Sequence, residues 1–348
     1  MDAARPCLPD PAFWAGRRVL VTGQTGFKGA WLSLWLAELG ATVIGFSRGV
    51  PTEPSLYALA GAGEAVEHHE GDVRDEQAVA RAVAAARADV VLHLAAQPMV
   101  RRSFAEPAQT YATNVMGTVN VLEAIRRATA PPGVVIVVTS DKCYENREWP
   151  WGYREHEPLG GHDPYSSSKA AAEIVAAAYR RSYHLPIASA RAGNVIGGGD
   201  WGEDRLVPDI FRALAAGEPV RIRNPNAIRP WQHVLNPLSG YLRLAEAAYA
   251  DPAARRAFNF GPAEEDARPV GWIAERLADR VEVDPGPHPH EAHWLKVDSS
   301  LARAKLRWRP TWGLAEGLDA TAEWFRAHRE GEDMRAVTHA QLAAFGAA

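Results

Sequence analysis

The chain has 348 residues, of which 47% are hydrophobic and 23% are charged, and its formal net charge is −4. These values are ordinary for a soluble globular protein, and the charge gives no reason to expect a nucleic acid or an acidic membrane surface as a partner. The chain has only two cysteines, Cys7 and Cys143, and no apolar run long enough to span a bilayer, so the sequence argues against a disulfide framework and predicts a cytoplasmic protein.

Strands and helices are expected to alternate through the first 197 residues. Short apolar runs predict strands at 17–23, 41–48, 65–73, 89–96, 133–140 and 186–197. Apolar residues at helical spacing predict helices at 28–40, 76–88, 107–128 and 165–183. This alternation is typical of an α/β fold in which a doubly wound parallel (Rossmann) sheet is covered by helices on both faces.

The alternation ends near residue 198, beyond which Gly, Pro, Trp and Arg become dense and short strands mix with helices. We therefore expect two units that pack together. The first is a Rossmann domain over 1–197, to which the chain returns around 231–262. The second is a smaller mixed α/β lobe that takes up most of 198–348.

The turn TGQTGFKG (22–29) follows the first strand and opens the first helix. Gly23 permits a tight turn, Gly26 allows the backbone to approach a pyrophosphate, and Gly29 permits close packing of helix on sheet. The helix N-terminus then presents N–H groups to the phosphates. In this strand–turn–helix context the glycines predict a dinucleotide site.

The GxxGxxG spacing resembles the short-chain dehydrogenase/reductase superfamily, and specifically its extended branch that acts on nucleotide sugars. The resemblance implies cofactor contacts at the glycine turn, at the ends of strands two to four and at a catalytic Tyr–Lys pair. These contacts would come from Gly23, Thr25, Gly26, Phe27, Lys28, Gly29, Arg48, Asp72, Val73, Leu94, Ala95, Ala96, Tyr165 and Lys169. NAD is the favoured cofactor. Strand two, however, ends in Ser47 and Arg48 where an acidic residue commonly holds the ribose, and Arg48 could meet a 2′-phosphate, so NADP stays open.

Tyr165 and Lys169 lie four residues apart on a predicted helix and therefore share a face. A cation beside a phenol favours the phenolate, which can take a hydroxyl proton while hydride leaves the same carbon. The family resemblance implies that Ser140, at the end of strand five, bonds the reacting sugar oxygen and that Tyr165 is the base. It also implies that Lys169 lowers the pKa of Tyr165 and holds the nicotinamide ribose.

After strand five the chain reads TSDK (139–142), where nucleotide-sugar dehydratases commonly have Thr–Asp–Glu. By that resemblance Asp141 protonates the leaving C6 hydroxyl, a role that an epimerase or a reductase does not need. The Asp–Lys variant resembles the CDP-glucose 4,6-dehydratases. Long stretches, including TGFKGAWLSLWL (25–36), SDKCYENREWPWGYRE (140–155) and RAGNVIGGGDWGEDRLVPD (191–209), extend that resemblance over almost the whole chain.

The resemblance implies oxidation of CDP-glucose at C4, loss of water from C5 and C6, and return of the hydride to C6. Lys142 has two open roles in this scheme. As the C5 base it must be neutral, so its pKa must fall from about 10.4 through burial or through the Lys169 cation. As an ammonium it stabilises the enolate while another group moves the proton.

Arginine suits a nucleotide-sugar pyrophosphate because its guanidinium binds phosphate bidentately. The predicted substrate contacts are Gln97, Asn194, Arg205, Leu206, Arg229 and Trp231. Core packing competes with this role for Trp231, and also for Trp201 and His233. His93 is expected to be a satisfied core histidine. HPHEAH (288–293) fits no zinc spacing, so no metal site is predicted.

The leading interpretation is therefore an NAD-dependent CDP-glucose 4,6-dehydratase, a lyase whose partner is a nucleotide sugar. The alternatives are a dehydratase or epimerase for a GDP-, dTDP- or UDP-linked sugar, or a cofactor-binding regulator that has lost catalysis. Superfamily members often pair through two helices, here 107–128 and 165–183, so a homodimer or a dimer of dimers is expected.

Overall fold

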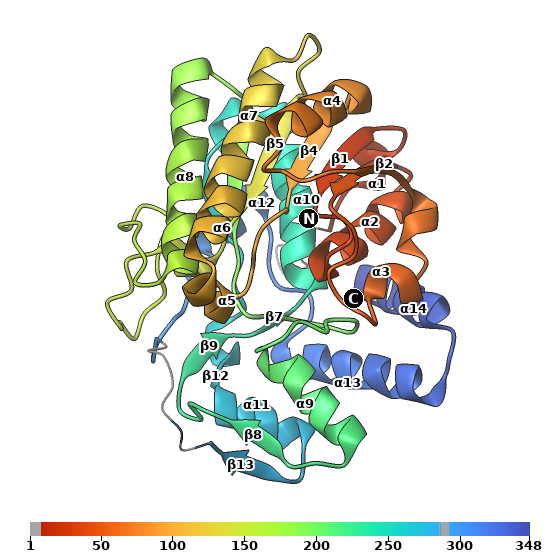
Figure 1. The fold of residues 1–348 in the computed structure, drawn as a ribbon, viewed down its shortest axis with the longest axis vertical. Coiled ribbons are helices and arrows are strands. Elements are labelled where there is room, and N and C mark those ends of the chain that lie inside the picture. Colours follow the sequence, from red (N-terminus) through yellow and green to blue (C-terminus); the bar gives the residue numbers. More distant parts are fainter. Residues whose placement is uncertain (1–7, 285, 287–291) are drawn as a thin grey trace.

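The computed structural model describes residues 8–284, 286 and 292–348. Its centre is a seven-stranded parallel sheet (Figure 1), which confirms the predicted fold class. In spatial order the strands are β11 (Ala257–Asn259), β6 (Ile187–Arg191), β5 (Val134–Val138), β4 (Val90–His93), β1 (Arg18–Thr22), β2 (Thr42–Ser47) and β3 (Val66–Glu70). β11 is the predicted returning strand and pairs with β6.

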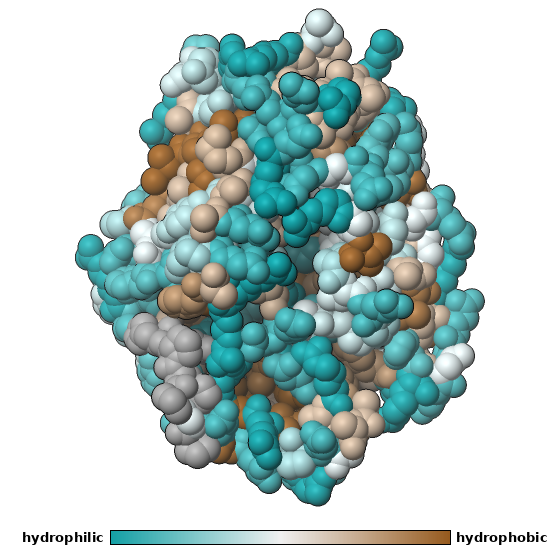
Figure 2. Space-filling model, in the orientation of Figure 1, coloured by the Kyte–Doolittle hydropathy of each residue, from teal (hydrophilic) through white to brown (hydrophobic). Residues whose placement is uncertain are grey.

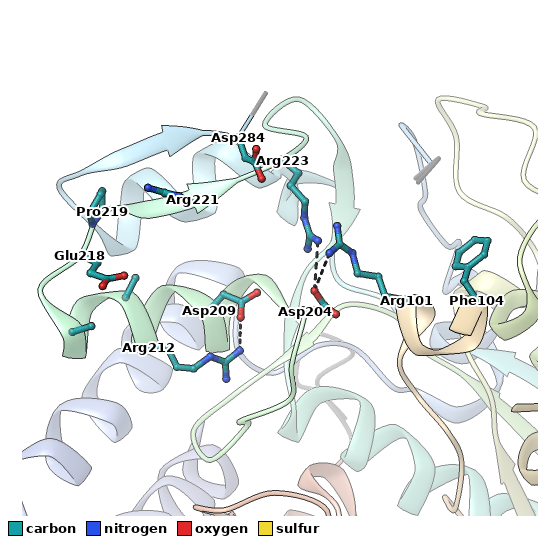
Figure 3. Close-up of a pocket in the computed structure, with 12 residues that line it drawn as sticks. Arg101, Phe104, Asp204, Asp209, Arg212, Glu218, Pro219, Arg221, Arg223 and Asp284 are labelled. Carbon is teal, nitrogen blue, oxygen red and sulfur yellow. Dashed lines mark hydrogen bonds and ion pairs between the residues drawn. The ribbon is translucent and has the colours of Figure 1, made fainter. Parts of the chain in front are cut away.

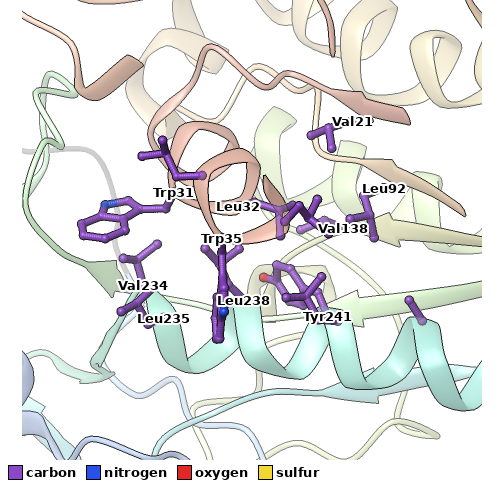
Figure 4. Close-up of a cluster of buried hydrophobic side chains, with 14 of the residues drawn as sticks. Val21, Trp31, Leu32, Trp35, Leu92, Val138, Val234, Leu235, Leu238 and Tyr241 are labelled. Atoms are coloured by element: carbon purple, nitrogen blue, oxygen red, sulfur yellow. The ribbon is translucent and has the colours of Figure 1, made fainter. Parts of the chain in front are cut away.

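The central strands are apolar on both faces because helices cover the sheet on both sides. One face packs on α4 (Glu76–Ala86), α7 (Gly117–Arg127) and α8 (Pro164–Tyr183). The other packs on α2 (Phe27–Glu38), α10 (Leu235–Ala250) and α12 (Ser300–Leu306). Figure 4 shows this second layer, in which Leu32 and Trp35 of α2 face Leu235, Leu238 and Tyr241 of α10.

A separate hydrophobic cluster lies below the main sheet in Figure 1. It joins α9 (Leu206–Ala216), α11 (Val270–Leu277) and β8 (Val220–Ile222), and β8 pairs with β13 (Val281–Val283). β9 (Ile228–Pro230) pairs with β12 (Ala267–Pro269), and β10 (Gln232–His233) pairs with β7 (Val195–Ile196). The chain ends in α13 (Leu314–Glu330) and α14 (Met334–Ala347).

Short elements complete the described chain. These are α1 (Pro11–Trp14), α3 (Leu56–Leu59), η1 (Ala62–Ala65), α5 (Val100–Ala105), α6 (Pro107–Tyr111), η2 (Ala112–Met116), η3 (Asp141–Cys143), η4 (Pro252–Ala254) and η5 (Glu264–Asp266). The expected helix at 107–128 is therefore three segments, because η2 is a π-helical turn between α6 and α7. No helix in the described ranges is long and apolar enough to cross a membrane.

The sixth predicted strand, 186–197, is broken after Arg191. Asn194 adopts a left-handed conformation with φ of +41°, which interrupts the extended backbone. A Cβ at Gly193 would lie 1.8 Å from the Asp141 carboxylate, so this bend brings bare backbone against a predicted catalytic side chain. Apolar pattern alone does not show such a break, because both halves of the segment are buried.

A loop of three glycines after β7 is fixed from two sides. Trp31 of α2 donates from its indole Nε1 to the Gly198 carbonyl at 3.0 Å. On the other side, a Cβ at Gly198 would lie 2.0 Å from the Trp324 ring of α13. The loop that leads to Arg205 is therefore held between the first long helix and the C-terminal helices.

Candidate active site

The glycine turn has the geometry expected of a dinucleotide cradle. Gly23 has a φ of +77°, and a Cβ there would lie 2.9 Å from the Ala95 backbone at the end of β4. At Gly29 a Cβ would lie 2.2 Å from the Gly23 carbonyl, so close packing requires glycine. At Gly26 a Cβ would have only the Gly23 carbonyl, at 3.4 Å, as a near neighbour. The protein's own packing therefore does not require glycine at 26, whereas close approach by an external group does.

The residues around this cradle are held by local hydrogen bonds. Thr25 donates to the Gly49 carbonyl at 2.7 Å, which ties the turn to the end of β2. Leu94 donates its backbone N–H to the Thr22 carbonyl, and the Ala95 N–H bonds the Thr22 hydroxyl. Phe27 and Lys28 form the first turn of α2. The carboxyl ends of β1, β2 and β4 therefore meet at one edge, where Ala96 continues the β4 loop.

Arg48 and Asp72 lie together at the next part of this edge. The Arg48 guanidinium is 3.6 Å from the Asp72 carboxylate, which also binds Arg74. The hydrogen bond from Arg74 is the largest influence that lowers the pKa of Asp72. Val73 is buried against Gly117. Arg48, the residue that kept NADP possible as a cofactor, is thus paired with a carboxylate rather than isolated.

The predicted catalytic residues converge from two elements. Ser140 and Asp141 follow β5, and the Ser140 hydroxyl donates to Asp141 Oδ1 at 2.9 Å. Lys142 is half-buried in η3, and its backbone N–H donates to Ser140 Oγ. Tyr165, in the first turn of α8, lies close enough to Ser140 and Asp141 for Ser140 to lower its pKa and for the Asp141 charge to raise it.

The ionisation of the Tyr–Lys pair differs from the simple expectation. Burial raises the pKa of Tyr165 to about 12, although Ser140 and Arg205 act against this rise. Burial also lowers the pKa of Lys169 to about 8. The Lys169 amine lies 3.4 Å from the Val138 carbonyl, so it is directed towards the end of β5. At this pKa the Tyr165 side chain is a neutral phenol at pH 7.

A third lysine and two further side chains belong to this cluster. Burial, Arg205 and Lys169 lower the pKa of Lys28 to about 7, and its Nζ lies 6.0 Å from the centre of the Tyr241 ring. Burial raises the pKa of Tyr241, as do the charges of Tyr165 and Asp141. Sequence reasoning placed Lys28 only at the cofactor and missed Tyr241, whose hydroxyl has no hydrogen-bond partner among the described residues.

Asp200 is the second residue that sequence reasoning missed. Its buried carboxylate binds Arg205 at 2.8 Å and acts on the charge of Lys28. Arg205 in turn acts on Tyr165, so this predicted phosphate ligand does lie beside the catalytic cluster. Leu206, the next residue, begins α9. Nothing in the stretch GGGDW (197–201) indicates from the sequence alone that its aspartate binds an arginine.

Other predicted substrate contacts are bound mainly within the protein. The Gln97 amide donates to Thr110 Oγ1 and to the Met99 carbonyl. Arg229 is buried and donates to the Ile228 carbonyl at 2.9 Å. Trp231 is buried in the lower cluster and donates to the Arg268 carbonyl. The Asn194 carbonyl accepts from Gln232. The structure therefore brings Arg205 to the cluster more directly than it brings these four residues.

The competing core interpretations hold for several side chains. His93 bonds Thr22 and Thr118, and burial lowers its pKa to about 3, so it is a neutral, satisfied core histidine. His233 packs against Trp31 and Trp312. Trp201 packs edge-on against Trp324.

Cysteine and metal chemistry find no support in the described part of the chain. Burial raises the pKa of the Cys143 thiol, so the thiolate is disfavoured. Within the described ranges no cluster of His, Cys, Asp or Glu is arranged to hold a metal. Most of the HPHEAH stretch, 288–291, lies outside the described residues.

Comparisons with known proteins agree with this geometry. A family model described as GDP-mannose 4,6 dehydratase matches residues 20–321. A CDP-glucose 4,6-dehydratase of Salmonella typhimurium is 50% identical over 341 residues, covering 93% of this chain and 95% of that protein. A dTDP-glucose 4,6-dehydratase of Streptomyces antibioticus is 30% identical, covering 89% of this chain and 93% of that protein.

Among solved structures, the fold is similar to DesIV, a dTDP-glucose 4,6-dehydratase of Streptomyces venezuelae crystallised with NAD and TYD bound. The TM-score is 0.79 at 25% identity, covering 90% of this chain and 98% of that chain. Both the fold and the catalytic motifs point to the same group of enzymes. The chain belongs to the nucleotide-sugar 4,6-dehydratases, a family of hydro-lyases built on the extended short-chain dehydrogenase/reductase fold.

Proposed function

We propose that this chain converts CDP-glucose to CDP-4-keto-6-deoxyglucose, with NAD as its cofactor. The observation that carries the proposal is the cluster of Ser140, Asp141 and Tyr165. It combines a group for C4 oxidation with an acid suited to the C6 hydroxyl. The identity to a CDP-glucose 4,6-dehydratase supports cytidine as the nucleoside.

The glycine turn fits a dinucleotide, because a Cβ at Gly26 would meet only the Gly23 carbonyl, at 3.4 Å, and this position adjoins the N-terminus of α2. NAD, when bound, supplies an acceptor for the C4 hydride and returns that hydride to C6. Arg48 favours a 2′-phosphate in isolation, but Asp72 lies 3.6 Å away and would repel that phosphate. The pair therefore supports NAD over NADP.

Tyr165 takes the C4 hydroxyl proton, and Ser140 holds the same oxygen. A phenol whose pKa is about 12 accepts a proton only after losing its own, so the surrounding positive charges are needed. Arg205 favours the phenolate directly. Lys169, whose pKa is about 8, is mostly charged at pH 7.

Asp141 donates a proton to the leaving C6 hydroxyl, and Lys142, in its neutral form, removes the C5 proton. A proton is returned to C5 when the hydride adds to C6. The 4-ketone acidifies C5–H, so a modest base is sufficient. Asp141 is 1% exposed and is fixed between the Ser140 hydroxyl and the Gly193 backbone. Such fixed placement matters because oxidation, elimination and reduction act on neighbouring carbons of one bound sugar.

The test is to incubate the protein with CDP-, dTDP-, UDP- and GDP-glucose, with NAD+ or NADP+, and to follow the 4-keto-6-deoxy product. We expect turnover with CDP-glucose and NAD+, and transfer of a deuterium label from C4 to C6 within one molecule. Turnover of only another of these nucleotide sugars would show that CDP-glucose is not the substrate. No product from any donor would favour a silent cofactor-binding protein.

The assembly is proposed to be at least a homodimer. Large apolar side chains are exposed along α8 and on the helices beside it, including Ile174 at 58% and Met116 at 51%. Figure 2 shows hydrophobic residues gathered at the upper left, where α8 and its neighbours lie. A contiguous apolar face of this kind marks an interaction surface.

A further inference from the structure

A cavity of about 950 Å³ lies between α5, α9 and β8 (Figure 3). Two arginines from different elements, Arg101 and Arg223, converge there on Asp204. The distances from their guanidinium nitrogens to Asp204 Oδ1 are 3.2 and 3.6 Å. Both contacts fall on Oδ1, so Asp204 Oδ2 has capacity to accept further hydrogen bonds.

Two of the segments that line this cavity, α5 and the loop before α9, also contact the catalytic cluster. On α5, the Ser103 hydroxyl accepts from the Tyr165 backbone N–H at 3.1 Å, while Arg101 and Phe104 line the cavity. In the loop before α9, Arg205 turns to Asp200 beside the catalytic residues, whereas its neighbour Asp204 faces the cavity. A ligand whose sugar lies at Tyr165 would therefore extend past Arg205 and into the cavity.

Resting on the proposed function, we propose that Asp204, held by Arg101 and Arg223, reads the cytosine base of the nucleotide sugar. Cytosine carries an exocyclic amine beside two acceptors, N3 and O2. A carboxylate accepts from the amine, and a guanidinium donates to the acceptors. Uracil has a carbonyl in place of the amine and an N–H at N3. Its carbonyl oxygen would therefore face the Asp204 carboxylate, and its N3–H would face a guanidinium N–H, so both contacts would be repulsive.

The backbone at Asp204 makes this position suitable for a clean test. Its φ is +55°, a left-handed conformation that Asn tolerates as well as Asp. Asp204→Asn therefore keeps shape and backbone while it removes the charge and lets the side chain donate as well as accept. Asp209→Asn is a matched control, because Asp209 lines the same cavity but pairs with Arg212 instead.

The experiment measures the affinities of CDP and UDP for the full chain by calorimetry. We expect the wild type to bind CDP about 10- to 100-fold more tightly than UDP, as one good bidentate base contact provides. Asp204→Asn should reduce this ratio to within about threefold. Arg223→Lys should also reduce it, because lysine lacks the planar guanidinium that can donate two parallel hydrogen bonds. Asp209→Asn should leave the ratio unchanged.

Equal wild-type affinity for CDP and UDP, or an undiminished ratio in Asp204→Asn, would overturn the proposal. Its failure differs from failure of the proposed function. If the wild type dehydrates CDP-glucose selectively and Asp204→Asn keeps the full ratio, only the base reading is lost. If CDP binds selectively through Asp204 but no sugar is dehydrated, the base reading stands and the activity is lost.

Discussion

Two lysines define the chemistry at the scale of single residues. Lys142 is the proposed C5 base, whereas Lys28 has a pKa that burial and nearby cations lower to about 7. Replacing Lys142 with Met should leave C4 oxidation visible as reduced cofactor at 340 nm. The same change should slow exchange of the C5 hydrogen with deuterated water by 100-fold or more, as loss of a general base does.

Lys28→Met is the matched control, because it removes an amine from the same cluster without touching the proposed base. It should keep C5 exchange within about tenfold of the wild type when the cofactor is saturating. Normal exchange in Lys142→Met would refute the base role. If the loss appeared instead in Lys28→Met, the base would be Lys28.

Sequence reasoning identified Ser140, Asp141, Tyr165 and Lys169 because each belongs to a dense local motif. It missed Tyr241 for a physical reason. Tyr241 sits among apolar residues of α10 at core spacing, and only the packing of that helix brings its hydroxyl near Asp141. Position in a helix shows that a side chain is buried, but not which polar group of a distant strand lies beside it.

At the scale of elements, two glycines of the turn between β1 and α2 are expected to have different roles: Gly29 is required for folding, and Gly26 for binding the cofactor. Gly29→Ala places a Cβ 2.2 Å from the Gly23 carbonyl and should lower the free energy of unfolding by about 1–3 kcal/mol. Gly26→Ala makes only an ordinary contact at 3.4 Å and should leave the thermal midpoint nearly unchanged.

The binding of NAD+ should show the opposite order at Gly26. Its added methyl group occupies the space that the pyrophosphate approaches, so we expect at least about tenfold weaker binding by calorimetry. A Gly26→Ala variant with wild-type affinity for NAD+ would contradict this role for the turn.

The order of strands and helices was predictable because central strands such as β5 (VVIVV) are short, buried apolar runs that alternate with helical patterns. The break between β6 and β7 was not, since Ala192, Gly193 and Asn194 continue a segment that is compatible with a strand. The backbone turns at Asn194, whose φ is +41°, and this bend sets Gly193 against the side chain of Asp141, which follows β5. Such a contact joins residues far apart in the sequence and forms only when β5 and β6 pair in the sheet, so the local sequence pattern does not reveal it.

At the scale of the whole molecule, the apolar face of α8 predicts association. Ile174→Asp combined with Met116→Asp should shift the mass in solution from two chains to one, as measured by light scattering, because charges are costly in a buried interface core. Val283→Asp, which changes another exposed apolar residue on β13, should leave the mass unchanged. A wild-type protein that sediments as a single chain would rule out this surface as a dimer contact.

Trp31 and Trp324, which pack against Gly198 from opposite sides, connect distant parts of the polypeptide. Trp324 comes more than a hundred positions after Arg205 along the chain, yet it packs against the glycine loop that leads to this arginine. Removing the last helices would therefore leave Arg205 in the polypeptide but take away Trp324, which packs against its loop. The C-terminal helices thus act as a structural brace for the loop that carries Arg205.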